Sequence, residues 1–412
     1  MTLLNNMPTS IDVKLSNKHL ALDLVRYTSG GISRADLARQ LGLSRAAMSS
    51  IVGDFLRLEM TRESENSPTN RGRRPVLLEI NPNFGYVVGV DVGATHVSLN
   101  LADFSANILN ASEFSFDVSK GPLVCLAEID EMLRSFLAEN GMDFPDLLAI
   151  GVGVPGPVVV ELGAVVAPPI MPGWDRFPIQ RHLENLWGCP VILGNDAELG
   201  ALGEWAYGAG RNEQHLLFVK VGYGIGAGLL LDGQIYRGAT GCAGEIGHIT
   251  VDENGPICTC GNRGCLEAFS GGRSIAQRAA KAIQSGRRTQ LSNIPIEKIT
   301  ASDVALYARK GDLVAQEIVA QAGEYLGTAL ASLINILNPG MIIIGGSVSQ
   351  MGDLFLEPIR QAATKRSLPV FSQSVRITAA YLGQRSSAIG AVTQALTLVA
   401  YQALEGNIPV KN

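Results

Sequence analysis

Four metal-binding side chains lie close together in the second half of the sequence. They follow the pattern H-x9-C-x-C-x4-C and are His248, Cys258, Cys260 and Cys265. Three thiolates and one imidazole form a tetrahedral zinc donor set, and a set that leaves no position for water is structural rather than catalytic. We therefore expect one structural zinc ion per chain, with free cysteines around a glycine loop as the alternative. The remaining cysteines, expected in the core, are Cys125, Cys189 and Cys242.

A second candidate for chemistry is the stretch GVDVGATHVSL at residues 89–99. It reads as two apolar strands joined by a glycine turn that opens with Asp91. Such a turn can bring backbone N–H groups up to a phosphate. The stretch HLLFVKVGYGIGAGLLLDGQIY, residues 215–236, repeats this layout. A single glycine-rich loop is weak evidence for nucleotide binding, so it has to be judged together with the residues around it.

From residue 83 onward, strand-like and helix-like segments alternate. LLAIGVGVPGPV reads as a strand entering a turn, PVILGNDAELGALGEWAYG as a strand running into a helix, and GMIIIGGSVSQMGDLFLEPIRQAA as a strand, a Gly-Gly turn and a helix. The two hairpins with glycine turns lie in separate halves of this region. This arrangement predicts a duplicated α/β fold with a cleft between two lobes.

The first 82 residues read as a small helical module. Ser33 is a good N-cap for a helix containing Leu37, and Gly42 suits the left-handed turn at the end of that helix. Ser44 caps a following helix. Two capped helices around a glycine turn indicate a helix-turn-helix, although an ordinary helical hairpin gives the same pattern. The expected DNA-contacting positions of the second, recognition helix are Ser44, Arg45, Ala46, Ser49 and Ser50.

The segment TRESENSPTNRGRRPVLLEINP, residues 61–82, follows these helices directly. A polar stretch with glycine and proline before the strand-like VLLEI is the layout of the wing in a winged helix. Residues 1–82 hold eleven Lys and Arg against eight Asp and Glu, whereas the whole chain has a net charge of −5. A mildly basic head thus precedes an acidic body. The arginines expected to enter a narrow A·T-rich minor groove, unless they are merely solvated, are Arg71, Arg73 and Arg74.

Length and composition exclude several other classes of protein. A chain of 412 residues is expected to form two or three domains, and 46% hydrophobic with 17% charged residues is typical of a globular protein. The N-terminal MTLLNNMPTS lacks the basic start and apolar core of a signal peptide. No stretch reaches the roughly 18–20 uninterrupted apolar residues of a membrane span. We therefore expect a cytoplasmic protein without membrane association.

Four motifs carry a resemblance to a known family: DVGATH, GNDAELGALGE, AGEIGH and CTCGNRGCLE. Together they resemble the ROK family of sugar kinases and sugar-responsive repressors, over essentially the whole chain after residue 83. With the helix-turn-helix in front, the chain is similar to the repressor branch, which includes xylose and N-acetylglucosamine repressors. The resemblance implies a winged helix-turn-helix domain in residues 1–82. In residues 83–412 it implies an actin-like, two-lobed ATPase fold of the sugar-kinase type, with its cleft near residues 195–270.

The resemblance also implies zinc on the cysteine motif and a sugar site beside it. The implied sugar-binding residues are Asn195, Asp196, Glu245, His248 and Glu267. Three carboxylates and an amide can satisfy several sugar hydroxyls, each of which both donates and accepts. His248 is expected to place one ring nitrogen on zinc and the other toward a hydroxyl. Surface charges are the alternative for the carboxylates, and Trp174 in PPIMPGWDRF is either a lid over the sugar or packing.

In the kinase branch, Asp196 would be the general base that takes a proton from the attacking sugar hydroxyl. The phosphate-binding positions depart from the kinase pattern, since Ala94 replaces a glycine, His96 a lysine and Tyr223 a threonine. Glu198 replaces an asparagine and is expected to repel phosphate. These departures predict that DVGATH keeps the shape of the kinase loop without binding ATP, and that no residue is catalytic.

We interpret the sequence as a sugar-responsive DNA-binding repressor of carbohydrate-utilisation genes. A homodimer, or a dimer of dimers, would bind a near-palindromic operator and be released or re-posed when a sugar such as xylose closes the lobes. The alternative from another class is an ATP-dependent, glucokinase-like sugar kinase that carries a DNA-binding head. A weaker third interpretation is an activator.

Overall fold

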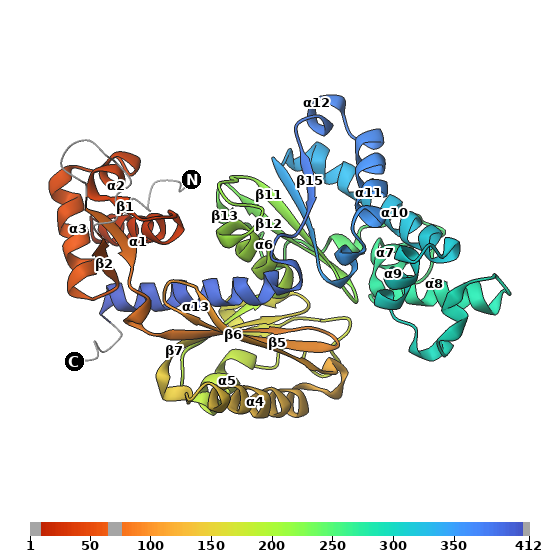
Figure 1. Cartoon of the computed structure of the whole chain (residues 1–412), viewed down its shortest axis with the longest axis horizontal. Helices are drawn as coiled ribbons and strands as arrows, with labels where there is room; N and C mark the ends of the chain where they lie inside the picture. The colour runs from red at the N-terminus through yellow and green to blue at the C-terminus, as the bar shows by residue number, and fades with distance from the viewer. Residues whose placement is uncertain (1–9, 65–75, 407–412) are drawn as a thin grey trace, which may run out of the picture.

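The computed structural model describes residues 10–64 and 76–406 of the 412-residue chain. It contains a small N-terminal module and two α/β lobes, and a long C-terminal helix crosses the first lobe to reach the module (Figure 1). The fold class predicted from the sequence is confirmed, because a helix-turn-helix module precedes a duplicated, two-lobed α/β region.

The N-terminal module contains three helices and a three-stranded antiparallel sheet. Its elements are α1 (Ser10–Tyr27), α2 (Arg34–Gln40), α3 (Arg45–Arg57), β1 (Ile32–Ser33), β2 (Thr61–Ser64) and β3 (Leu77–Ile80), with strand order β1-β3-β2. Both predicted caps are confirmed, because the Ser33 hydroxyl accepts from the Asp36 N–H and the Ser44 hydroxyl from the Ala47 N–H. Gly42, with φ +64°, makes the expected left-handed turn between α2 and α3.

Each lobe is built around a five-stranded sheet, and the two sheets share one strand order. The first is β6-β5-β4-β7-β10, with β4 (Tyr86–Val92), β5 (His96–Asp103), β6 (Ile108–Ser115), β7 (Leu147–Val154) and β10 (Val191–Asn195). The second is β13-β12-β11-β14-β15, with β11 (Leu216–Val221), β12 (Ile225–Leu231), β13 (Gln234–Ile235), β14 (Met341–Gly345) and β15 (Arg376–Ala379). In each, an antiparallel glycine hairpin is followed by a strand parallel to its first strand. The predicted duplication is therefore confirmed.

Helices cover both faces of the first-lobe sheet. On one face lie α4 (Pro122–Glu139) and α5 (Ile179–Trp187), and on the other lies α13 (Ser386–Glu405) (Figure 1). α13 approaches the sheet closely, because a Cβ added to Gly89 of β4 would lie 2.4 Å from the Ala388 carbonyl oxygen. The short strands β8 (Val158–Val159) and β9 (Ala164–Val165) form a separate hairpin.

By length and composition, one helical stretch of the described chain, Gly383–Glu405, is apolar enough to cross a bilayer. In the structure, 72% of its most apolar window is buried within the protein. This helix packs on the first-lobe sheet and on α6, so its apolar character is that of a core helix.

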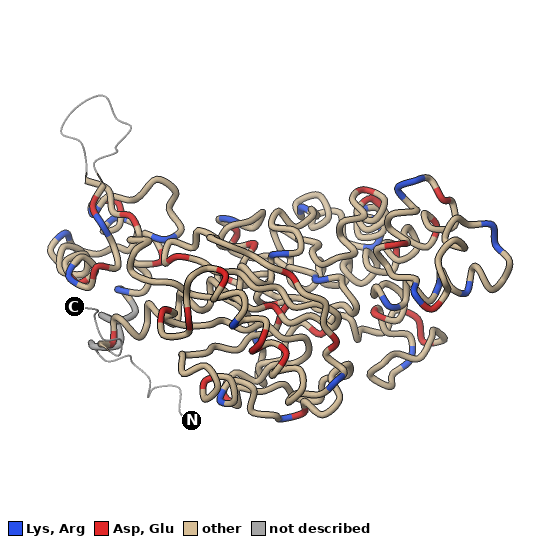
Figure 2. The backbone as a smooth tube through the Cα atoms, turned by 60° about the horizontal axis from the view of Figure 1, so that its bottom comes forward, with Lys and Arg blue, Asp and Glu red and all other residues tan. Residues whose placement is uncertain are grey.

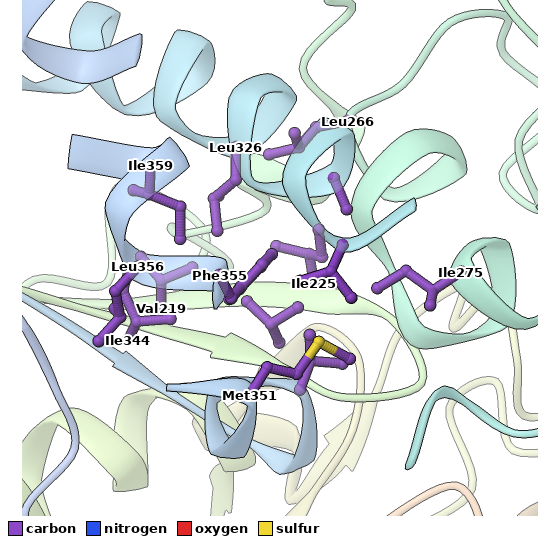
Figure 3. Packing of buried hydrophobic residues seen from close by; sticks show 14 of the residues in the cluster. Val219, Ile225, Leu266, Ile275, Leu326, Ile344, Met351, Phe355, Leu356 and Ile359 are labelled. Atoms are coloured by element: carbon purple, nitrogen blue, oxygen red, sulfur yellow. The ribbon is translucent and has the colours of Figure 1, made fainter. Parts of the chain in front are cut away.

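The second-lobe sheet is also covered on both faces. Side chains alternate along β11, so that Val219 faces a layer of helices and Phe218 faces α6 (Asp196–Tyr207). Figure 3 shows the core of the helical side, which contains Val219 and Ile344 from the sheet and Leu326 and Phe355 from the helices. The helices on that side and around it are α7 (Glu267–Ser270), α8 (Gly272–Gln284), α9 (Ala301–Arg309), α10 (Leu313–Leu337), α11 (Asp353–Arg366) and α12 (Pro369–Ser372).

The two lobes meet where α6 crosses α13. A Cβ added to Gly203 of α6 would lie 2.3 Å from the Ser386 carbonyl oxygen, and one added to Gly390 of α13 would lie 1.7 Å from the Leu199 carbonyl oxygen. The helix backbones therefore touch directly, because the crossing has no space for a side chain. The buried Glu204 carboxylate braces this junction by accepting hydrogen bonds from three backbone N–H groups and from the Ser386 hydroxyl.

The N-terminal module is packed against both of these crossing helices. α1 lies beside the end of α13, where the ring centroids of His19 and Tyr401 are 3.6 Å apart. At the end of α6, the Trp205 ring lies 5.1 Å from the Tyr27 ring of α1. The Arg211 guanidinium, just after α6, donates to the Tyr27 carbonyl oxygen. One hydrophobic cluster includes residues of the module, the first-lobe sheet and α13.

Candidate functional site

The four predicted metal ligands lie together in the second lobe. His248 ends the 3-10 turn Ile246–His248, and the three cysteines are in the loop before α7. Their ligand atoms all lie within 4.8 Å of one another. The sulfurs of Cys260 and Cys265 are 3.7 Å apart, and the Cys258 sulfur lies 3.6 Å from His248 Nδ1. A tetrahedral ion with metal–sulfur bonds of about 2.3 Å and metal–nitrogen bonds of about 2.05 Å requires about 3.8 Å and about 3.6 Å for these separations. The donor set therefore fits a metal ion of this kind.

The cysteine loop owes its tight shape to backbone hydrogen bonds and glycines. The Cys258 N–H donates to the Asn262 carbonyl oxygen at 2.7 Å. Gly264 has φ +73°, and a Cβ there would lie 1.6 Å from the Asp252 carbonyl oxygen, so no other residue fits. This backbone holds the cysteines in place before any metal is added.

Three carboxylates converge beside the metal ligands. Asp196 is the first residue of α6, Glu245 directly precedes the turn that carries His248, and Glu267 is the first residue of α7. Burial, and then the nearby charges of Asp196 and Glu267, raise the pKa of Glu245 to about 7. His248 stands between the two groups, because its Nδ1 faces Cys258 and its Nε2 lies 3.9 Å from Glu245 Oε2. The arrangement offers hydroxyl-binding oxygens on one side and a metal-binding set on the other.

Two of the predicted sugar contacts also have structural tasks. The Asn195 side-chain oxygen caps α6 by accepting from the N–H groups of Ala197 and Glu198, and its nitrogen donates to the Gly156 carbonyl oxygen. Only one of its N–H bonds is left for a ligand. Glu267 accepts from the Ile225 N–H and from the Thr259 hydroxyl, both at 3.0 Å. Asn195 therefore positions Asp196, and Glu267 ties the second glycine hairpin to the cysteine loop.

Lys220 is a member of the site that the sequence interpretation missed. Its Nζ lies 2.9 Å from Asp196 Oδ2 and 3.3 Å from Asp91 Oδ2. Burial alone would lower the pKa of Lys220, but the charges of Asp196 and Asp91 raise it above its usual value. The sequence did contain a signal for this contact. A lysine stands inside the apolar run LLFVKVG, on the same face of the strand as Phe218, and a charge on a buried face needs a partner.

The side chain of His96 covers the glycine turn of the DVGATH motif. A Cβ added to Gly93 would lie 2.5 Å from His96 Cε1, so the imidazole covers the turn. Ala94 packs against the first-lobe core. Tyr223, which is 40% exposed, lines a groove of about 350 Å³ together with Cys258 and Glu267. The three departures from the kinase pattern thus place side chains on or beside the two glycine turns.

The structure corrects two expectations and decides a third. Cys242 is only partly buried and is not a core residue, because it lies in the turn before AGEIGH, whereas Cys125 and Cys189 are buried as predicted. Glu198 is not free to repel phosphate, because it is buried and its Oε2 lies 3.1 Å from Arg237 Nε. Trp174 is packing and not a lid, since it is fully buried and donates to the Val118 carbonyl oxygen.

Helix α3, which the sequence predicts to be the recognition helix, presents its predicted DNA-contacting residues to solvent. Arg45 has no ion pair with any other residue that the structure describes, whereas Arg39 and Arg57 are paired with acids on their own helices. Basic and acidic residues are interspersed along this module (Figure 2). The predicted wing arginines Arg71, Arg73 and Arg74 lie outside the described residues. The exposed positions are Ser44, Arg45, Ala46, Ser49 and Ser50.

Known proteins match this chain over two different lengths. A xylose repressor of Caldicellulosiruptor bescii is 29% identical over 386 residues, 93% of this chain and 96% of the relative. That match includes part of the N-terminal module, because only 412 − 82 = 330 residues follow position 82. A glucokinase of Halalkalibacterium halodurans is 36% identical, but over 74% of this chain and 93% of the relative.

A solved structure and a family model also match this chain. The crystal structure of a ROK family transcriptional regulator, described as a homologue of Escherichia coli Mlc, covers 95% of this chain and 98% of its own, with 27% identity and a TM-score of 0.78. Residues 87–397 match the ROK family. This chain therefore belongs to the ROK family.

Proposed function

We propose that this chain is a sugar-responsive transcriptional repressor that binds operator DNA through its N-terminal module. The observation that carries the proposal is the position of α6. Asp196, in the carboxylate cluster, begins this helix, and Trp205 near its other end contacts Tyr27 of the module. A sugar that moves Asp196 therefore acts on a helix that touches the DNA-binding module.

The ligand that suits the carboxylate cluster is a neutral sugar with several hydroxyls. Carboxylates accept hydrogen bonds from hydroxyl groups, and Asp196, Glu245 and Glu267 surround the site from three different elements. A phosphorylated sugar suits it less well, because its charge would face three acids. Relatives named xylose repressors make xylose the first sugar to test.

We assign zinc to the metal ligands. His248, Cys258, Cys260 and Cys265 would hold one ion per chain, and a closed set of four protein ligands gives the ion a structural task. Its contribution would be to fix the His248 ring, so that Nε2 points toward Glu245 and the sugar hydroxyls.

The proposal also includes the oligomeric state, the cellular location and the domain boundary. A homodimer, or a dimer of dimers, would place two α3 helices on the half-sites of a near-palindromic operator in the cytoplasm. We assign residues 1–82 and 83–412 to the two domains, an assignment that the turn at Pro82–Phe84 supports.

The test measures sugar binding and DNA binding with one preparation of the protein. A thermal-shift screen of neutral sugars would identify the ligand, and the operator would be selected from a random DNA pool with the sugar-free protein. Sugar should weaken operator binding, and DNA must weaken sugar binding by the same factor. Operator binding that is unchanged by a sugar which itself binds tightly would refute the proposed response.

A second candidate function is an ATP-dependent sugar kinase with a DNA-binding head. It is favoured by the glucokinase match and by Asp196, to which the family resemblance gives the position of the general base. A coupled ATP assay with saturating sugar and magnesium would decide between them. Sustained turnover of about one per second, typical of kinases, would establish this second function, whereas the side chains at the two glycine turns lead us to expect no turnover.

A further inference from the structure

One ion-pair network joins the two lobes at the sugar site. Lys220 projects from β11 of the second lobe, Asp91 is the last residue but one of β4 in the first lobe, and Asp196 begins α6. The exposed fractions of the Lys220, Asp196 and Asp91 side chains are 15%, 15% and 1%. Because so little water reaches the network, its charges interact far more strongly than they would at the surface.

Two carboxylates at this depth repel one another, and a positive charge between them offsets that repulsion. Magnesium ions are bound by such carboxylate oxygens, usually together with the phosphates of a nucleotide. Here the Lys220 ammonium group already lies between Asp91 and Asp196. The other basic side chain that faces Asp91 is the imidazole of His96, which covers the first glycine turn.

The Lys220 contact leaves Asp196 able to bind a ligand. Nζ engages Asp196 Oδ2, whereas Oδ1 accepts no hydrogen bond from any other residue that the structure describes. An ionised carboxylate only accepts hydrogen bonds, so the free Oδ1 suits a sugar hydroxyl that donates.

We propose that Lys220 is a positioning residue that takes the place of a divalent cation in the sugar site. It orients Asp196, and it ties that carboxylate to Asp91 across the lobes. Sugar binding then needs neither magnesium nor nucleotide. This inference rests on the proposed sugar site and adds to that site a positive charge supplied by the Lys220 side chain.

Three variants test the inference. Lys220→Met removes the charge and keeps most of the length, Lys220→Arg keeps a cation, and Lys220→Met with Asp91→Asn also removes the carboxylate that the first change leaves unpaired. Sugar affinity would be measured by calorimetry, and the thermal midpoint with and without millimolar MgCl2.

For the wild type, sugar affinity should be the same with and without magnesium. Lys220→Met should lose about tenfold or more in sugar affinity. Its thermal midpoint should be lower than that of the wild type and should rise when magnesium is added. Lys220→Arg should retain more of the affinity than Lys220→Met. The double variant should recover the midpoint but not the affinity, because Asp196 still lacks its cation.

Two results would overturn the inference. One is a double variant that regains both midpoint and affinity, since Lys220 would then merely balance Asp91. The other is a wild-type protein whose sugar affinity depends on magnesium. If no sugar binds the wild type, the proposed function fails by itself. The effect of magnesium on the thermal midpoint of Lys220→Met still tests whether Lys220 takes the place of a divalent cation. The absence of that effect would refute the inference. Should Lys220→Met not fold, the double variant supplies the comparison.

Discussion

Replacement of Gly390 by alanine tests the contact between the two lobes. The new Cβ would lie 1.7 Å from the Leu199 carbonyl oxygen and 2.4 Å from its carbonyl carbon. Carbon needs about 3.5 Å to such atoms, so α13 and α6 must move apart by more than about 1 Å at the crossing. The obstacle is backbone, which cannot rotate away as a side chain can.

The expected effect combines two opposing contributions. Overpacking in a core costs about 1–3 kcal/mol and sometimes more, and we place this site at the upper end because backbone is involved. Alanine in place of glycine within a helix returns about 1 kcal/mol. We expect the free energy of unfolding to fall by about 2 kcal/mol, measured by urea unfolding followed by circular dichroism.

The same substitution at Gly53 is the matched control. Gly53 lies inside helix α3, and a Cβ there would meet no atom within 4 Å. Gly53→Ala should therefore stabilise the protein by about 0.5–1 kcal/mol. Equal effects at Gly53 and Gly390 would show that the crossing is not a steric contact, and the account of how the lobes meet would be wrong. Gly390→Ala should also weaken sugar binding, because Asp196 is on the displaced helix.

Four further expectations follow from the sites. Purified protein should carry about one zinc per chain by elemental analysis, and Cys260→Ser should lose the metal, stability and sugar affinity together. Arg45→Ala should weaken operator binding and reduce the slope of its salt dependence by about one for a lost phosphate contact, or change base preference. Asp196→Asn and Glu245→Gln should each lose about tenfold or more in sugar affinity while keeping operator affinity, because an amide nitrogen, which only donates, replaces an oxygen that accepts a hydrogen bond. Burial raises the pKa of Asp23 to about 6, opposed in part by Arg26, so the folded protein holds a proton there that the unfolded chain releases near pH 4. The unfolding free energy should thus fall by at most about 3 kcal/mol as pH rises from about 4 to about 6, and Asp23→Asn should remove that loss.

Each of these expectations has an outcome that contradicts it. Metal-free protein of full stability would remove the zinc assignment, and wild-type operator binding by Arg45→Ala would remove α3 from the DNA interface. Unchanged sugar affinity would exclude the mutated carboxylate from the site. A pH profile identical for wild type and Asp23→Asn would show that this carboxyl is not the titrating group.

Sequence patterns sufficed where the cause of a structure is local. Ser33 and Ser44 cap their helices because a hydroxyl needs only the N–H groups of the next turn, and the metal ligands lie within one short stretch. Burial of Glu198 against Arg237 and the contact of Lys220 with Asp91, 129 residues away, arise only when distant strands and helices assemble. No window of the sequence contains both partners, so these pairings could not be predicted.

The position of α13 in the chain has a consequence for how the protein is made. This helix comes last among the described elements, yet it covers one face of the first-lobe sheet and supports α1 of the N-terminal module. During synthesis the module and the first-lobe strands leave the ribosome long before the helix that completes both of them. Until then, an apolar sheet face stays open and the module has no support, which is a state prone to aggregation. A nascent or truncated chain lacking α13 therefore has neither a complete first lobe nor a supported N-terminal module.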